Sequence, residues 1–121
     1  MLTEKDYCDY DTCVALWNMG LIPHPYDNTH MDKVMAIITL YEAQKWLREE
    51  KGLFVNVELF GHYDRDVDGK TLDTWVYYSY AILNTKTADF IREYDLCTEY
   101  QTYEEAFSEG IKEAIKILKE K

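Results

Sequence analysis

The chain has 121 residues, enough for one domain with a core of its own and without metal or disulfide staples. Apolar residues make up 47% of it, which excludes a disordered chain. Its formal net charge of −10 argues against direct binding to nucleic acid or to an anionic membrane surface, because both rely on Lys and Arg.

Two features bear on the compartment. No apolar run of about 18 residues occurs, and no basic-then-apolar leader follows Met1. The three cysteines, Cys8, Cys13 and Cys97, are an odd number without the spacing of a disulfide framework. We therefore expect a cytoplasmic protein.

The first predicted helix is short. Asp9 or Asp11 is a suitable N-cap, the helix ends at Met19, and Gly20 favours a left-handed stop. Two prolines and Asp-Asn predict a loop over residues 22–32. We expect residues 34–38 to be extended. The predicted inward stripe of this helix comprises Cys13, Leu16, Trp17 and Gly20.

Two longer helices are predicted by a repeated capping phrase. Thr39-Leu-Tyr-Glu-Ala43 and Thr102-Tyr-Glu-Glu-Ala106 both place a threonine three residues before a Glu, which is the capping box. The first helix runs from about Leu40 to Lys51 and stops at Gly52; the second runs from Tyr103 to about Lys119. Gly110 inside the second predicts close contact with the sheet or the other long helix, since it costs about 1 kcal/mol against Ala.

Three strands are predicted between these helices, at residues 54–60, 75–83 and 90–100, with turns near 64–69 and 84–87. In the first, Val55, Val57 and Leu59 share the inward face. The order predicts a single α+β domain. Residues 1–38 form an N-terminal helix and loop, and residues 39–121 form an αβββα core, a three-stranded antiparallel meander covered on one face by two helices.

Tyrosine is abundant, with eleven residues, and strand 75–83 carries aromatic side chains on both faces. One face lies under the helices, so the other is expected to be open. Amphipathic rings on an open face indicate partner contact or self-association, with ordinary cross-strand packing as the alternative. The candidate interface comprises Phe54, Phe60, Trp75 and Tyr77.

Two patterns resemble metal sites. The spacing Cys8-x4-Cys13-x10-His24-x5-His30 is close to a zinc pattern, but its central spacer is short. A buried thiol with loop histidines is the favoured interpretation, and we expect no zinc.

The second pattern, Asp64-x-Asp66-x-Asp68-Gly69, is the first half of a calcium loop, whose twelfth position must supply a Glu. That position is Trp75, so a solvated hairpin turn is favoured and no calcium is expected.

Catalytic motifs are missing from the sequence: there is no Gly-rich phosphate loop, no nucleophile elbow and no His-Glu metalloprotease spacing. His62 beside Tyr63 and Asp64 forms a candidate acid–base pair, but a lone His near a hairpin is more often structural. We expect neither an enzyme nor a cofactor.

Two resemblances concern the whole chain. The order of helix, three strands and helix is similar to the double-stranded RNA-binding domain. That family binds phosphate with a lysine-rich start to its last helix, where Thr102–Glu109 is acidic, so RNA binding does not carry over. The segments Leu16–Leu21, Thr39–Gly52 and Thr102–Ile111 resemble uncharacterised small proteins of phages and mobile elements of gut bacteria. This resemblance implies the fold and a phage-related origin, and no activity.

The sequence therefore predicts a non-enzymatic protein-interaction module, with homodimerisation as its expected form. An acidic DNA mimic that inhibits a nucleic-acid-binding host protein is the alternative. A ligand- or metal-dependent enzyme is a third hypothesis, which requires a deep pocket at His62 or at the Asp64–Asp68 cluster.

Overall fold

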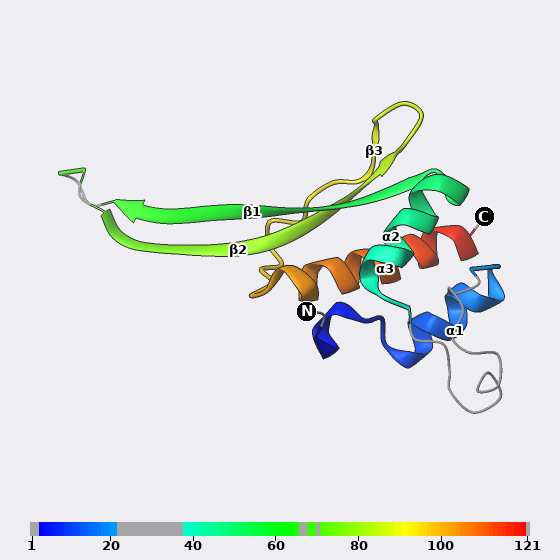
Figure 1. Cartoon of the computed structure of the whole chain (residues 1–121). Coiled ribbons are helices and arrows are strands. Elements are labelled where there is room, and N and C mark those ends of the chain that lie inside the picture. Colours follow the sequence, from blue (N-terminus) through cyan, green and yellow to red (C-terminus); the bar gives the residue numbers. More distant parts are fainter. Residues whose placement is uncertain (1–2, 22–37, 66–67, 70, 121) are drawn as a thin grey trace.

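The structure is a computed structural model that describes residues 3–21, 38–65, 68–69 and 71–120, with the backbone alone described for residues 62–65 and 71–74. Its elements confirm the α+β class and the order of helices and strands (Figure 1). They are η1 (Glu4–Asp6), α1 (Tyr10–Asn18), α2 (Leu40–Trp46), η3 (Leu47–Lys51), β1 (Leu53–Arg65), β2 (Thr71–Asn84), β3 (Phe90–Arg92) and α3 (Tyr103–Lys119).

The predicted caps determine where both long helices begin. Thr39 and Glu42 form the complete capping box of α2, because the Glu42 amide donates to Thr39 Oγ1 (3.0 Å) and the Thr39 amide donates to Glu42 Oε1 (3.1 Å). At α3, the Glu105 amide donates to Thr102 Oγ1 (3.1 Å), which is the first half of the predicted box. Both helices start at the predicted residue because these bonds are local in sequence.

The short helix α1 also has the predicted ends. Asp9 is its N-cap and accepts from the Thr12 amide (2.8 Å). At the other end Gly20 has a positive φ of 109°, and the Leu21 amide donates back to the Leu16 carbonyl (3.0 Å). This is the long hydrogen bond of a Schellman stop, which glycine permits because it has no Cβ.

The predicted helix over residues 40–51 consists of two parts. α2 ends at Trp46, and a single wider π-type turn, η3, continues to Lys51 before Gly52 stops it in the left-handed conformation (φ 71°). The buried stripe is as predicted, since Leu40, Ala43 and Leu47 have no exposed surface.

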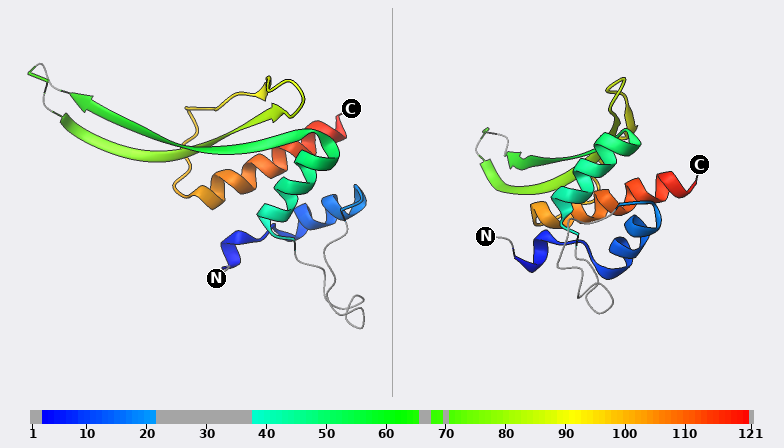
Figure 2. Two further views of the ribbon diagram at one scale, coloured as in Figure 1. Left: turned by 45° about the horizontal axis from the view of Figure 1, so that its top comes forward. Right: turned by 45° about the vertical axis from the view of Figure 1, so that its right-hand side comes forward.

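The sheet is an antiparallel meander in the order β1-β2-β3, with Val57 opposite Tyr80 and Leu59 opposite Tyr78. Both long strands exceed their predicted ranges, and the hairpin projects beyond the helices (Figures 1 and 2). We call its far end, residues 59–65 and 71–78, the arm. Because β3 pairs with β2 only near Ile82 and Leu83, the arm is a two-stranded ribbon along most of its length.

The prediction of a third strand over residues 90–100 is wrong for most of that range. β3 ends at Arg92, and the chain returns to the sheet at one bridge, between Tyr100 and Tyr78. Asp95 explains the departure, because its carboxylate accepts from the Cys97 amide (3.0 Å) and the Thr98 hydroxyl (2.9 Å). Such local bonds favour a turn over a strand ladder.

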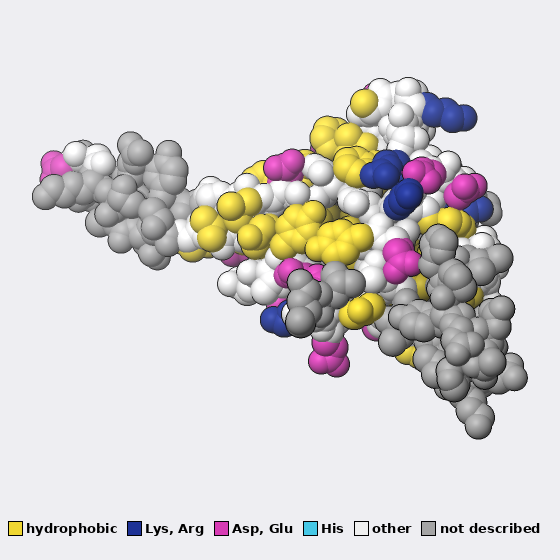
Figure 3. Space-filling model, in the orientation of Figure 1, with side chains coloured by type: hydrophobic (Ala, Val, Ile, Leu, Met, Phe, Trp, Pro, Cys, Tyr) yellow, Lys and Arg dark blue, Asp and Glu magenta, His cyan; other side chains and the backbone are white. Residues whose placement is uncertain are grey.

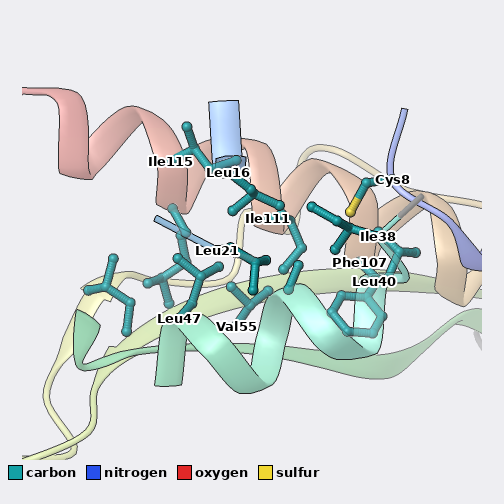
Figure 4. Close-up of a cluster of buried hydrophobic side chains, with 14 of the residues drawn as sticks. Cys8, Leu16, Leu21, Ile38, Leu40, Leu47, Val55, Phe107, Ile111 and Ile115 are labelled. Atoms are coloured by element: carbon teal, nitrogen blue, oxygen red, sulfur yellow. The ribbon is translucent and has the colours of Figure 1, made fainter. Parts of the chain in front are cut away.

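The core lies between the sheet and the helices (Figure 4), with α3 against both β1 and β2. Helix α1 lies on the far side of α3 (Figure 1). Gly110 is the point of closest approach: a Cβ there would lie 2.5 Å from Val55 Cγ1 and 3.1 Å from Tyr80 Cγ. Close contact with the sheet or with the other long helix was predicted, and the contact is with the sheet. Residues of α3 buried in this core are Ala106, Phe107, Gly110, Ile111, Ala114, Ile115 and Ile117.

Candidate functional site

The register assigns the side chains of β1 and β2 to two faces of the sheet. The helix face, on the side of α3, carries Val55, Val57, Leu59, Val76, Tyr78, Tyr80 and Ile82. The back face carries Phe54, Asn56, Glu58, Phe60, Trp75, Tyr77, Ser79 and Ala81.

The back face was predicted to be open, and the segment from Glu93 to Glu99 covers part of it instead. The Ser79 hydroxyl donates to the carbonyl of Asp95 (3.2 Å), and the Asn56 amide group donates to the Tyr94 hydroxyl (2.6 Å). Tyr94 and Asp95, within the segment that leaves the strand ladder, therefore contact this face.

The four predicted interface residues differ in exposure. Tyr77 is 6% exposed and stacks on Phe60, with ring centroids 5.7 Å apart, so the expectation of an open position is wrong for Tyr77. Phe54 and Phe60 are half-buried. Trp75 is 36% exposed, and its indole N–H donates to a Glu99 carboxylate oxygen (3.3 Å). Whether these residues form an interface stays a prediction.

A more open apolar surface lies on the helix face of the arm. Leu59 is 56% exposed and Val76 is 62% exposed, although the pattern placed Leu59 inward. Leu59 does share the face of Val57, but its ladder partner Tyr78 contacts Tyr103, the first residue of α3, so Leu59 lies at the edge of the surface that this helix covers. The residue opposite Val76 is Gly61, which has no side chain to cover it. Figure 3 shows hydrophobic side chains gathered along the hairpin where it leaves the helices.

This surface continues onto the helical body through aromatic rings. The rings of Tyr78 and Tyr103 meet edge to face at 5.9 Å, and Tyr103 meets Phe107 in the same way at 5.7 Å. Phe107 in turn contacts Tyr41, which is 47% exposed (5.5 Å). The apolar surface of the arm is thus fixed to the core by successive ring contacts of a favoured geometry.

Element lengths are the signal that sequence reasoning missed. The 17 residues of α3 span about 25 Å at 1.5 Å per residue. The 13 residues of β1 span about 43 Å at 3.3 Å per residue. A single helix of this length cannot cover such a strand, so apolar residues such as Leu59 and Val76 are left exposed.

An open groove of about 600 Å³ lies where η1 and the start of α1 face the start of α3. Cys8 and Cys13 are part of its wall, and the Cys13 thiol donates to the Cys8 carbonyl (3.7 Å). Burial raises the pKa of Cys8 to about 12, with further contributions from Cys13 and Asp9. Burial also raises the pKa of Cys13. Both thiols are therefore protonated at neutral pH, which makes them weak nucleophiles.

The described residues contain no group of three or more His, Cys, Asp or Glu side chains that could hold a metal ion. The zinc and calcium patterns are only partly covered, since His24, His30 and Asp66 lie outside the described residues. So do the side chains of Asp64, His62 and Tyr63, while Asp68 is exposed.

No protein-family model matches the chain, and no curated protein or solved structure is significantly similar to it. Within the described ranges, none of the helices combines the length and the apolar character needed to cross a bilayer.

Proposed function

We propose that this chain is a non-enzymatic, cytoplasmic protein-interaction module of phage or mobile-element origin. The observation that carries the proposal is the arm, whose helix face exposes Leu59 (56%) and Val76 (62%). The origin rests on the resemblance of the segments Leu16–Leu21, Thr39–Gly52 and Thr102–Ile111 to small phage-associated proteins.

The arm contributes little to the core. The buried cluster reaches Val57 on β1 and Ile82 on β2, and no buried hydrophobic residue of the arm except Tyr77 is found where side chains are described. A two-stranded ribbon is marginally stable in water by itself. An extended ribbon with exposed apolar side chains is therefore better explained by contact with a partner than by stabilisation of the domain.

The experiment compares proteins retained from a bacterial lysate by immobilised wild-type protein and by the variant Leu59→Ser/Val76→Ser. We expect the variant to fold normally and to lose the specific partner. The matched control is Phe90→Ser/Leu96→Ser, because these two residues are similarly exposed (50% and 52%) but belong to β3 and the segment after it, outside the arm. Equal retention by all three proteins contradicts the proposal.

The same experiment addresses the DNA-mimic alternative. A mimic predicts that the retained protein is released by competing duplex DNA and that the loss of Leu59 and Val76 has little effect. The expected homodimer is checked by light scattering at tens of micromolar: a dimer dissociated by Leu59→Ser/Val76→Ser would identify the partner as a second copy.

A further inference from the structure

The outer edge of β1 is a second feature of the arm. In the order β1-β2-β3, the described strands give β1 a neighbour on one side only. It is 13 residues long, against a usual strand length of about five or six. Such an edge presents a row of backbone N–H and C=O groups to any chain that approaches.

One contact shows which backbone groups point outward. The Gln44 side-chain amide in α2 donates to the Val55 carbonyl (2.6 Å), so Val55 directs its backbone groups away from β2. Because this direction alternates along an antiparallel strand, Val57, Leu59 and Gly61 also point outward. Among the described residues, none pairs with these three. Within the described part of the chain, a side chain thus covers this edge at Val55, while Val57, Leu59 and Gly61 keep their outward groups unpaired.

Natural edge strands are usually protected against unwanted pairing by lysine, by proline, by bulges or by short length. Residues 53–61 contain no Lys, Arg or Pro. The one irregularity of the β1–β2 register lies at Asp64 and Arg65, near the tip. The middle of this edge is consequently long and carries, of these devices, only the charge of Glu58.

The neighbouring side chains define what an added strand would carry. On the helix face it would lie beside Val57 and Leu59, which favour apolar partners. On the back face it would lie beside Glu58, an exposed carboxylate in a molecule of net charge −10. These surroundings favour cationic side chains, whereas a second copy would bring a further charge of −10.

We propose that the β1 edge from Val57 to Gly61 binds an extended segment of a partner protein as an additional strand, with apolar and basic side chains in alternation. This mode is β-strand addition, in which main-chain hydrogen bonds give affinity and alternate side chains give specificity. It rests on the proposed function, because it specifies the partner segment of the same arm.

The test titrates ¹⁵N-labelled protein with a synthetic eight-residue peptide of alternating valine and lysine. We expect the amides of Val57, Leu59 and Gly61 to shift and to become protected from hydrogen exchange. A valine–glutamate peptide should bind at least about tenfold more weakly. The same valine–lysine peptide methylated on alternate backbone nitrogens keeps its charge but cannot donate hydrogen bonds to the β1 edge. Its affinity should therefore also fall about tenfold or more. Equal binding of either control peptide overturns the proposal.

A variant of the edge gives an independent readout. Leu59→Pro removes an outward N–H without removing a β1–β2 hydrogen bond. It should lower the affinity for the valine–lysine peptide about tenfold. Leu59→Ser is the matched control: it keeps that N–H and should lower the affinity for the peptide less. If Leu59→Pro fails to fold, binding of the methylated peptide to the wild-type protein still tests strand addition.

Two outcomes separate this proposal from the proposed function. In the first, the amides of Val57, Leu59 and Gly61 become protected as the protein concentration rises, without any peptide. This result would assign the edge to a second copy and overturn the strand-addition proposal. Absence of peptide binding, together with a lysate partner that depends on Leu59 and Val76, would overturn strand addition and leave the interaction module intact.

Discussion

Gly110 illustrates how one residue determines the distance between two layers. Its missing Cβ lets α3 approach Val55 and Tyr80 more closely than any other residue would allow. Glycine is unfavourable inside a helix by about 1 kcal/mol relative to alanine. At Gly110 the close packing of α3 on the sheet offsets this cost.

Replacing Gly110 by Ala should therefore destabilise the protein, by about 1–3 kcal/mol, because the new methyl group would overlap Val55. Urea unfolding measures the change. Gly61→Ala is the matched control, since a Cβ there meets nothing within 4 Å, and it should leave stability unchanged or slightly higher. If Gly110→Ala were stabilising, helix propensity would outweigh the packing argument.

The three cysteines differ in burial, and we expect them to differ in reactivity. Cys97 is exposed, whereas Cys8 and Cys13 are buried. Burial raises the pKa of Cys8 from 9.0 to about 12, so its thiolate fraction at pH 8 falls about a thousandfold. Mass spectrometry after maleimide treatment should show one rapid addition per chain. The Cys97→Ser variant should show none until the protein is unfolded, and rapid labelling of that variant would contradict the assignment.

At the scale of elements, Asp9 joins two helices. It caps α1 through the Thr12 amide, and its Oδ2 lies 3.0 Å from Lys112 Nζ in α3. Burial acts to raise the pKa of Asp9, but the hydrogen bonds from Thr12 and the charge and hydrogen bond of Lys112 together lower it. The ionised carboxylate is thus favoured in the folded state, and it stabilises the fold above its unfolded pKa.

This contribution should be lost as the pH falls through the lowered folded pKa of Asp9. At pH 7 we expect Asp9→Ala to lose about 1 kcal/mol and Asp9→Asn to lose less, since Asn caps equally well but cannot pair with Lys112. Urea unfolding in steps from pH 7 to pH 2.5 tests the sign. The difference between wild type and Asp9→Asn should shrink toward zero in acid, and a difference that grew in acid would contradict this account.

The helices could be predicted from the sequence because their ends depend on hydrogen bonds between residues three to five positions apart. Strand 90–100 could not, since the side chain of Asp95 competes with the ladder and diverts the chain. The candidate site was predicted only in part. Alternation shows that Tyr77 and Trp75 share a face, but not that residues 94 and 95 contact this face or that Tyr77 is buried. It also cannot show that Leu59 lies at the first turn of α3, where the helix covers it little.

At the scale of the whole molecule, the protein consists of a packed body and a projecting arm. The body holds the core cluster, and the arm consists mainly of local pairing between β1 and β2. The two parts should therefore be separable in stability.

Replacing residues 61–76 by Asn-Gly would join Phe60 to Tyr77, which are opposite each other in the ladder, through a favoured two-residue turn. We expect this shortened protein to unfold cooperatively, with a stability within about 1 kcal/mol of the full chain, as measured by urea unfolding. Its control is Leu59→Ser/Val76→Ser in the full-length chain. Loss of cooperative unfolding in the shortened protein alone would show that the arm supports the body.

The three tryptophans lie in three separate regions, which gives the molecule its own optical probes. Trp17 packs against the core, Trp46 lies 5.4 Å below the Lys51 ammonium, and Trp75 stands on the arm. An occupant of the back face of the hairpin should therefore shift the emission of Trp75 alone toward the blue, whereas an occupant confined to the helix face or to the outer edge of β1 should leave all three emissions unchanged. A Trp75→Phe protein should give no such spectral change in either case.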